Sequence, residues 1–149
     1  MAFATNSSDN NKCNDAAKKI SKNADGHASG NVCEIGLSRD SPIIMLSTKQ
    51  GVSNEKINEL TSMEYKYQPS SASSTNKVLM LAEFQLKQTE VNNVQKTLLN
   101  NGWMVTAIHN HELLENPLMI YLHAQKSDNL NNILKDVKDV LSKTDCKCT

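Results

Sequence analysis

The stretch that decides the fold is residues 104–123, which read Met-Val-Thr-Ala-Ile-His-Asn-His-Glu-Leu-Leu-Glu-Asn-Pro-Leu-Met-Ile-Tyr-Leu-His. Its pattern predicts a strand over 104–111, a short loop, and a second strand over 117–124. Because side chains alternate between the two faces of a strand, His109 and His111 project from the same face. Two imidazoles about 7 Å apart along a strand can bind one metal ion, so these two histidines are the first candidate ligands.

The remaining ligands depend on how the two strands pair. In a tight hairpin, opposite residue numbers sum to about 228, which places His123 opposite Val105 and ~13 Å from His109 unless a bulge or an intervening strand brings them closer. An acid at the same rim is expected if strand 78–86 runs parallel to 104–111. The predicted metal ligands are therefore His109 and His111 first and Glu83 and His123 second, with Glu112 and Glu115 of the following loop as further candidates. Imidazole and carboxylate favour a Zn or Cu ion.

The flanking sequence predicts the elements around this hairpin. Residues 78–86 are apolar on both faces at their start, which is typical of a central strand. A helix capped by Thr89 should end at Asn100-Asn101-Gly102, and a last helix, capped by Ser127 or Asp128, carries an unbroken apolar stripe. Strand, helix, strand, strand, helix is most of a ferredoxin-like unit, so the predicted class is α+β.

The first half should add an N-terminal helix and further antiparallel strands to this unit. Residues 1–12 are rich in Ser, Asn and Asp and predict a disordered segment, and 13–148 form the predicted single domain. A short helix capped by Asn14 or Asp15 follows. Strands are expected at 32–37, 43–48 and 63–68, with turns at 38–42 and 50–51, an ambiguous segment at 54–60 and a loop at 69–77.

Arg39, the only arginine in the chain, follows the predicted strand 32–37 directly. An arginine next to an acid at a turn usually forms a local ion pair or caps carbonyl groups. Anchoring a carboxylate ligand is the alternative, because a guanidinium group can bind a carboxylate through two parallel hydrogen bonds.

Four cysteines lie near the two ends of the chain: Cys13, Cys33, Cys146 and Cys148. In an exported protein this placement predicts two disulfides. A bridge between Cys146 and Cys148 would be strained, so each of them is expected to pair with Cys13 or Cys33. The competing interpretation is a soft-metal Cys-x-Cys site at the C-terminus.

Composition narrows the possible partners. Lys plus Arg and Asp plus Glu each total 16, so the formal net charge is zero and electrostatics favours neither nucleic acid nor an anionic membrane. No apolar run approaches the roughly 20 residues that a transmembrane helix needs. The first residues carry no signal-peptide pattern, and the chain reads like the mature form of a secreted or cell-surface protein.

Three passages resemble the LppY/LpqO family of bacterial exported proteins and lipoproteins, over about residues 14–143. They are Ala16 to Ile20 with Gly30 to Arg39, then Leu79 to Leu86 with Glu90 to Val94, and finally Val105 to His111 with Pro117 to His123. The most specific part is Val-Thr-Ala-Ile-His-Asn-His, which is similar to that family's Val-Thr-Ala-Leu-His-Asn-His. The resemblance implies export and a histidine-bearing surface, and no reaction.

The chain departs from the family pattern at three places. Ala82-Glu83 replaces a Gly-Asp pair and keeps an acid, Ser38-Arg39-Asp40-Ser41 replaces Pro-Arg-x-Asp, and Ala124 to Ser127 replaces a glycine-rich stretch. The leading hypothesis is a small exported metal-binding domain without catalysis. The alternatives are a metal-dependent hydrolase, with Glu83, Glu112 or Glu115 as base, and a ligand- or peptide-binding module without metal.

Overall fold

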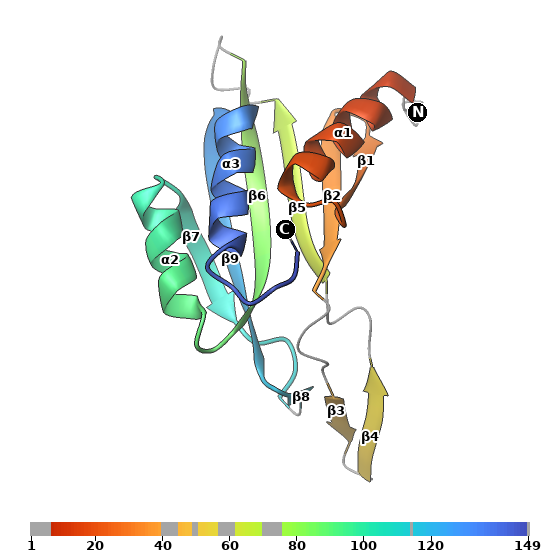
Figure 1. The fold of residues 1–149 in the computed structure, drawn as a ribbon, viewed down its shortest axis with the longest axis vertical. Helices are drawn as coiled ribbons and strands as arrows, with labels where there is room; N and C mark the ends of the chain where they lie inside the picture. The colour runs from red at the N-terminus through yellow and green to blue at the C-terminus, as the bar shows by residue number, and fades with distance from the viewer. Residues whose placement is uncertain are drawn as a thin grey trace.

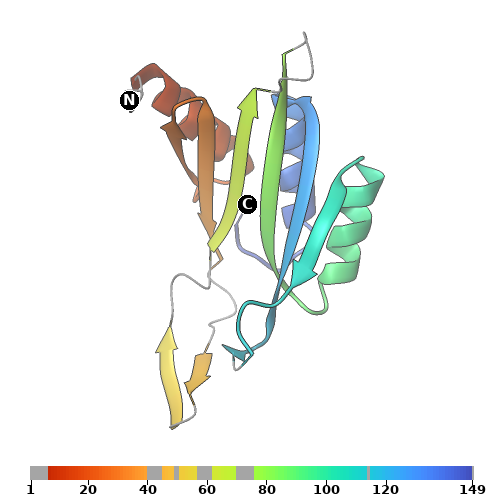
Figure 2. The ribbon, with the colours of Figure 1, turned by 180° about the vertical axis from the view of Figure 1, so that it is seen from behind.

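The protein is a two-layer structure in which three helices cover one face of an antiparallel sheet; the opposite face, on which no described helix packs, is called the bare face here (Figures 1 and 2). The computed structural model describes residues 7–39, 45–48, 51–56, 62–69, 76–113 and 115–148. The predicted α+β class is confirmed. No helix in these ranges is long and apolar enough to cross a membrane.

Twelve elements follow one another along the described part of the chain. The helices are α1 (Ser7–Ile20), α2 (Val91–Asn100) and α3 (Leu130–Leu141). The strands are β1 (Asp25–Ser29), β2 (Val32–Ser38), β3 (Met45–Thr48), β4 (Gly51–Lys56), β5 (Ser62–Pro69), β6 (Lys77–Lys87), β7 (Met104–His109), β8 (Glu115–Asn116) and β9 (Met119–Asn129). The main sheet has the order β1-β2-β5-β6-β9-β7, and a small sheet has the order β4-β3-β8.

One half of the main sheet, with the helices that pack on it, is the predicted strand-helix-strand-strand-helix unit, β6-α2-β7-β9-α3. Strand β9 lies between β6 and β7 and is antiparallel to both, so β6 and β7 run parallel to each other, as predicted. Strand β6 is an interior strand, which confirms the interpretation of its apolar sequence. The two-residue β8 interrupts the connection from β7 to β9 and pairs with β3.

The core lies between the sheet and the helices because apolar residues alternate along β6 and recur along α3. Met80, Ala82, Phe84 and Leu86 are buried on β6. The apolar stripe of α3 is buried against them at Ile133, Leu134, Val137, Val140 and Leu141. The same alternation turns polar side chains of β5, β6 and β9 toward the bare face.

Two predicted helix caps are wrong by one or two residues. The N-cap of α2 is Glu90 rather than Thr89, and its side chain makes no cap hydrogen bond because it binds Arg39 instead. The N-cap of α3 is Asn129, since β9 continues that far, and its side chain accepts a hydrogen bond from the backbone N–H of Asn132 at 2.9 Å. The predicted left-handed stop after α2 is confirmed at Gly102, with φ of 77°.

Helix α1 begins at Ser7, so residues 7–12, whose composition predicts disorder, form its first turns. The predicted strands at 32–37 and 63–68 are confirmed as β2 and β5. For the strand expected at 43–48, the described part is β3. Residues 40–42 of the predicted turn at 38–42, residues 70–75 of the predicted loop at 69–77 and residues 57–60 of the ambiguous segment 54–60 lie outside the described residues.

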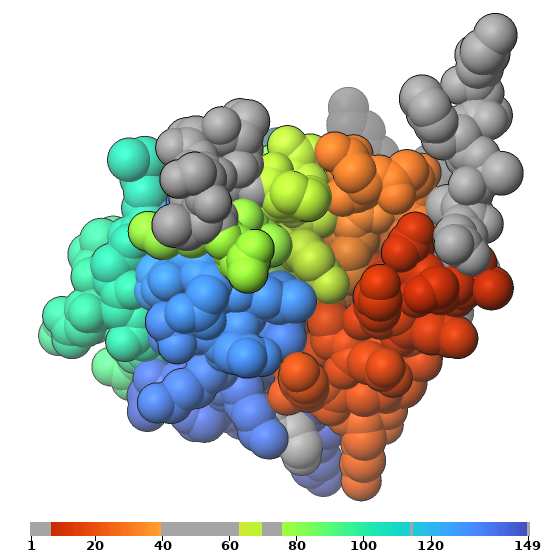
Figure 3. All heavy atoms as spheres, turned by 90° about the horizontal axis from the view of Figure 1, so that it is seen from above, coloured from red at the N-terminus to blue at the C-terminus, as the bar shows by residue number. Residues whose placement is uncertain are grey.

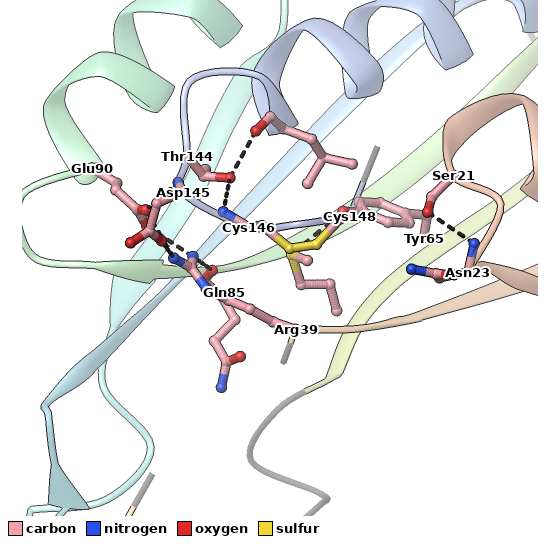
Figure 4. The surroundings of a disulfide bond; sticks show 12 residues. Ser21, Asn23, Arg39, Tyr65, Gln85, Glu90, Thr144, Asp145, Cys146 and Cys148 are labelled. Atoms are coloured by element: carbon pink, nitrogen blue, oxygen red, sulfur yellow. Dashed lines mark hydrogen bonds and ion pairs between the residues drawn. A yellow bond between two sulfur atoms is a disulfide. The ribbon is translucent and has the colours of Figure 1, made fainter. Parts of the chain in front are cut away.

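The predicted pairing between N-terminal and C-terminal cysteines is wrong. The disulfides are Cys13–Cys33 and Cys146–Cys148. Helix α1 packs against β1 and β2, which brings the Cα atoms of Cys13 and Cys33 to 5.5 Å. The C-terminal cysteines instead lie beside Tyr65 and the side chain of Arg39 (Figure 4).

Arg39 is the centre of a buried ion-pair network that joins three distant parts of the chain (Figure 4). Its guanidinium group, 1% exposed, donates two hydrogen bonds of 2.8 Å to the carboxylate of Glu90 and one of 2.9 Å to the backbone oxygen of Gln85. It also pairs with Asp145, which in turn pairs with Lys87. Burial acts to raise the pKa of Asp145, but the hydrogen bond from Lys87 and the positive charges of Arg39 and Lys87 together hold this pKa below its ordinary value.

Candidate metal centre

Three of the four histidines meet on the bare face of the main sheet. His109 is the last residue of β7, His111 lies in the loop that follows, and His123 lies on β9. In the strand register His123 is opposite Glu83 on β6 and opposite Ala107 on β7. Each of the three histidines offers a ring nitrogen within 4.8 Å of the others.

Both features that were expected to bring His123 closer to His109 than the ~13 Å of a tight hairpin, a bulge and an intervening strand, are present. The observed register places His109 opposite Tyr121 and His123 opposite Ala107, because β7 has an irregularity between Val105 and Ala107. The connection is also no tight hairpin, since Glu115 and Asn116 pair with β3 on the way. His109 and His123 are therefore diagonal neighbours on one face, with their Nε2 atoms 2.9 Å apart.

The distance between the Nε2 atoms of His109 and His123 is close to the distance between two nitrogen ligands of one metal ion. A tetrahedral zinc ion with Zn–N distances of about 2.0–2.1 Å separates two ligand nitrogens by about 3.3 Å, so these rings would need to part by only about 0.4 Å. The Nδ1 of His109 lies 3.2 Å from the backbone oxygen of Asn110. When that nitrogen donates a proton to the carbonyl oxygen, Nε2 of His109 is left as the acceptor that a metal requires.

His111 is held by stacking on a buried tyrosine. Its ring lies parallel to that of Tyr121, with a centroid separation of 3.5 Å and an interplanar angle of 1°. Gln85 of β6 donates a hydrogen bond of 2.9 Å to the Tyr121 hydroxyl group. Burial raises the pKa of Tyr121 to about 12, so the phenol is neutral. Partial desolvation lowers the pKa of His111, against an opposing effect of Glu83, and favours the neutral imidazole that binds metals.

The rings form a continuous row beside the acid Glu83. His109 stacks between His111 and His123, at centroid separations of 5.1 Å and 4.9 Å. At the end of the row a carboxylate oxygen of Glu83 lies 3.5 Å from Nε2 of His123. All four predicted ligands, His109, His111, Glu83 and His123, therefore lie in one row.

A hollow of about 230 Å³ opens on the bare face next to this row. Glu83 and His123 belong to its wall, so a small molecule in the hollow would touch the candidate metal centre. The other lining residues are Glu64, Lys66, Leu81, Ala82, Thr106 and Ala124. Lys66 pairs with Glu64 at 3.4 Å and with Glu34 at 3.7 Å.

The two further acids of the loop do not belong to the histidine group. Glu112 is exposed. Glu115 is buried on β8, where its Oε1 atom accepts a hydrogen bond from the backbone N–H of Met119 and its Oε2 atom has no hydrogen-bond partner among the described residues. Burial raises the pKa of Glu115.

Sequence reasoning missed Tyr121, on which His111 stacks, and Gln85, which donates a hydrogen bond to the Tyr121 hydroxyl group. The available signal was the alternation along β9, because Tyr121 precedes His123 by two residues and must share its face. The fourth histidine, His27, lies on β1 at the opposite edge of the sheet and is no part of the group.

The fold and the histidine row define a small α+β domain with a histidine-bearing sheet face. The chain belongs to the family described as Domain of Unknown Function (DUF1259), which matches residues 17–143 and thus includes the whole histidine row. Searches among curated proteins and among solved structures found no match.

Proposed function

We propose that this domain binds one divalent transition-metal ion on the bare face of its sheet, through His109, His111 and His123. Glu83 serves as the fourth ligand, because its carboxylate oxygen lies 3.5 Å from Nε2 of His123, the ring nitrogen that also faces His109. The observation that carries the proposal is the convergence of three ring nitrogens within 4.8 Å of one another. Stacking on Tyr121 supports it further, because a ligand that is already held in place loses less conformational entropy on binding.

The donor set favours zinc or copper. Imidazole nitrogen suits both ions, and a single carboxylate can complete a four-coordinate shell. Ca²⁺ and Mg²⁺ prefer shells made of oxygen ligands, which this row does not supply. Cu²⁺ should bind more tightly than Zn²⁺, following the general affinity order of divalent metals for nitrogen ligands.

Export and membership of the LppY/LpqO group are part of the same proposal. Two disulfides support export, because disulfides persist in oxidising compartments and are rare in the cytosol. The His-Asn-His passage at residues 109–111 supports the resemblance to the LppY/LpqO proteins.

Calorimetric titration of Zn²⁺ and Cu²⁺ into protein purified without a histidine tag tests metal binding. We expect one ion per chain, and a loss of affinity of at least about a hundredfold in His109→Ala, more than the 10- to 100-fold typical of an outer-shell change. His27→Ala is the matched control, because it removes an exposed histidine from the opposite edge of the sheet. Equal affinity in wild-type protein and His109→Ala would refute the proposal.

The hollow beside Glu83 and His123 favours a metal-dependent hydrolase as the second candidate. It gives a small substrate room next to the ion, where Glu83 could accept a proton from attacking water. On this reading, zinc-loaded protein hydrolyses p-nitrophenyl acetate faster than the metal-free protein, and Glu83→Gln abolishes the difference without abolishing zinc binding. Identical hydrolysis rates with and without zinc would contradict the hydrolase candidate and leave only the metal-binding proposal.

A further inference from the structure

The main sheet ends at β7 without a further strand among the described residues. The order β1-β2-β5-β6-β9-β7 places β1 at one edge and β7 at the other. The outward N–H and C=O groups of such an edge strand form a template on which another strand can pair. In the space-filling view, α2 and β7 form one lateral margin of the molecule (Figure 3).

Exposed apolar side chains gather at this same margin. Among the described residues, five large hydrophobic side chains are exposed, and three of them belong to α2 and β7. Leu99 of α2 is 53% exposed, and Met104 and Ile108 of β7 are 60% and 44% exposed. The β7–β9 register places Met104 and Ile108 on opposite faces of the sheet, so exposed apolar side chains flank the edge strand on both faces.

Charge distinguishes the two edges of the sheet. Strand β7 carries no Asp, Glu, Lys or Arg, and α2 carries only Lys96. The β1 edge has Asp25, which pairs with Lys18 of α1 at 2.9 Å. Charged side chains are a common device against edge-to-edge pairing, and β7 lacks them.

We propose that two copies of this chain associate through their β7 edges, in antiparallel fashion, to form one continuous sheet. A two-fold interface must be complementary to itself, and an uncharged edge brings no like charges together. The chain as a whole has zero formal net charge, so long-range repulsion between copies is small. A partner that binds through charge complementarity is disfavoured, because β7 carries no Asp, Glu, Lys or Arg.

The α2 helices contribute to the same contact. Helix α2 packs on β7 at the margin of the sheet, so antiparallel pairing of the β7 strands would bring the two α2 helices, each with its exposed Leu99, toward each other (Figure 1). The irregularity between Val105 and Ala107 shortens the regular pairing between copies. Apolar burial by Leu99, Met104 and Ile108 therefore supplies much of the stability of the contact.

Sedimentation velocity of the full chain over a wide concentration range tests this proposal, with no metal added. We expect wild-type protein to approach twice the 16.5 kDa chain mass as concentration rises. Ile108→Lys should weaken the association by about tenfold or more, because each copy then brings a charge to the same interface. Leu81→Lys is the matched control, since Leu81 is 52% exposed but lies on β6, away from the edge.

Several outcomes would overturn the proposal. The proposal is wrong if the wild-type protein stays at the monomer mass at every concentration. It is also wrong if Leu81→Lys weakens the dimer as much as Ile108→Lys does. Leu99→Lys provides a second variant on a separate element, in case Ile108→Lys fails to fold. Hydrogen exchange gives an independent readout: the outward amides of β7 should be protected at high concentration only, and equal exchange at both concentrations contradicts the proposal.

Discussion

At the residue scale, Nε2 of His123 is close to two other candidate ligands, His109 and Glu83. Its Nε2 atom lies 2.9 Å from Nε2 of His109 and 3.5 Å from the Glu83 carboxylate. A carboxylate beside the metal-facing nitrogen of an imidazole can join the same ligand shell. Glu83 is therefore expected to contribute directly to metal affinity.

We predict that Glu83→Gln lowers the affinity for Zn²⁺ by about 10- to 100-fold, because the substitution removes the negative charge next to His123 while keeping the shape of the side chain. Glu64→Gln is the matched control, since Glu64 is the cross-strand neighbour of Glu83 and lies on the same face. Competition with a chromogenic zinc chelator measures both variants. Equal losses in the two variants would mean that only the general charge of the face matters.

At the element scale, three strands assemble the histidine row. Strand β9 carries His123, β6 carries Glu83, and β7 ends at His109. Each alternates its side chains, so the apolar set faces the helices and the polar set meets on the bare face. The row depends on the register between β7 and β9, because a shift of one residue would turn His109 toward the helices.

At the scale of the whole molecule, Arg39 ties the end of β2 to the β6–α2 turn and the C-terminal tail. The Glu90 carboxylate also accepts hydrogen bonds from the backbone N–H groups of Lys87 and Asp145, at 2.8 Å and 2.9 Å. This network stabilises the end of the molecule where the two sheets approach each other. The interpretation of Arg39 as a structural ion pair is confirmed, although Glu90 lies 51 positions away and is no local partner.

We predict that Arg39→Met lowers the free energy of unfolding by about 3–5 kcal/mol, because it leaves the buried Glu90 carboxylate without its cation. The double variant Arg39→Met with Glu90→Met should lose less than the sum of the two single variants. Urea unfolding followed by circular dichroism measures all three. Strictly additive losses would show that the pair contributes no mutual stabilisation.

Much of the fold was predictable because periodicity is a local property. The alternation along β6, the apolar stripe of α3 and the glycine stop after α2 each follow from short stretches of sequence. The caps of α2 and α3 were not predictable to the residue. Glu90 is recruited by Arg39 from far away along the chain, and nothing near Thr89 signals this.

The candidate site divides in the same way. Sequence pattern selected His109, His111, His123 and Glu83 by residue type and strand alternation, although β7 ends at His109 and the predicted strand does not extend to His111. It missed the support of His111 by Tyr121 and Gln85, and it left the separation of His109 and His123 dependent on whether a bulge or an intervening strand is present. Both points concern contacts across strands.

The sequence by itself determined the element types, the apolar face of each element and the residues able to bind a metal, because these follow from side-chain chemistry and from periods of two or 3.6 residues. Only the tertiary structure decided the β7–β9 register, the disulfide pairs and the partners of Arg39. Each of these depends on long-range pairing, in which an irregularity in β7 or a detour through β8 moves a side chain by several ångströms.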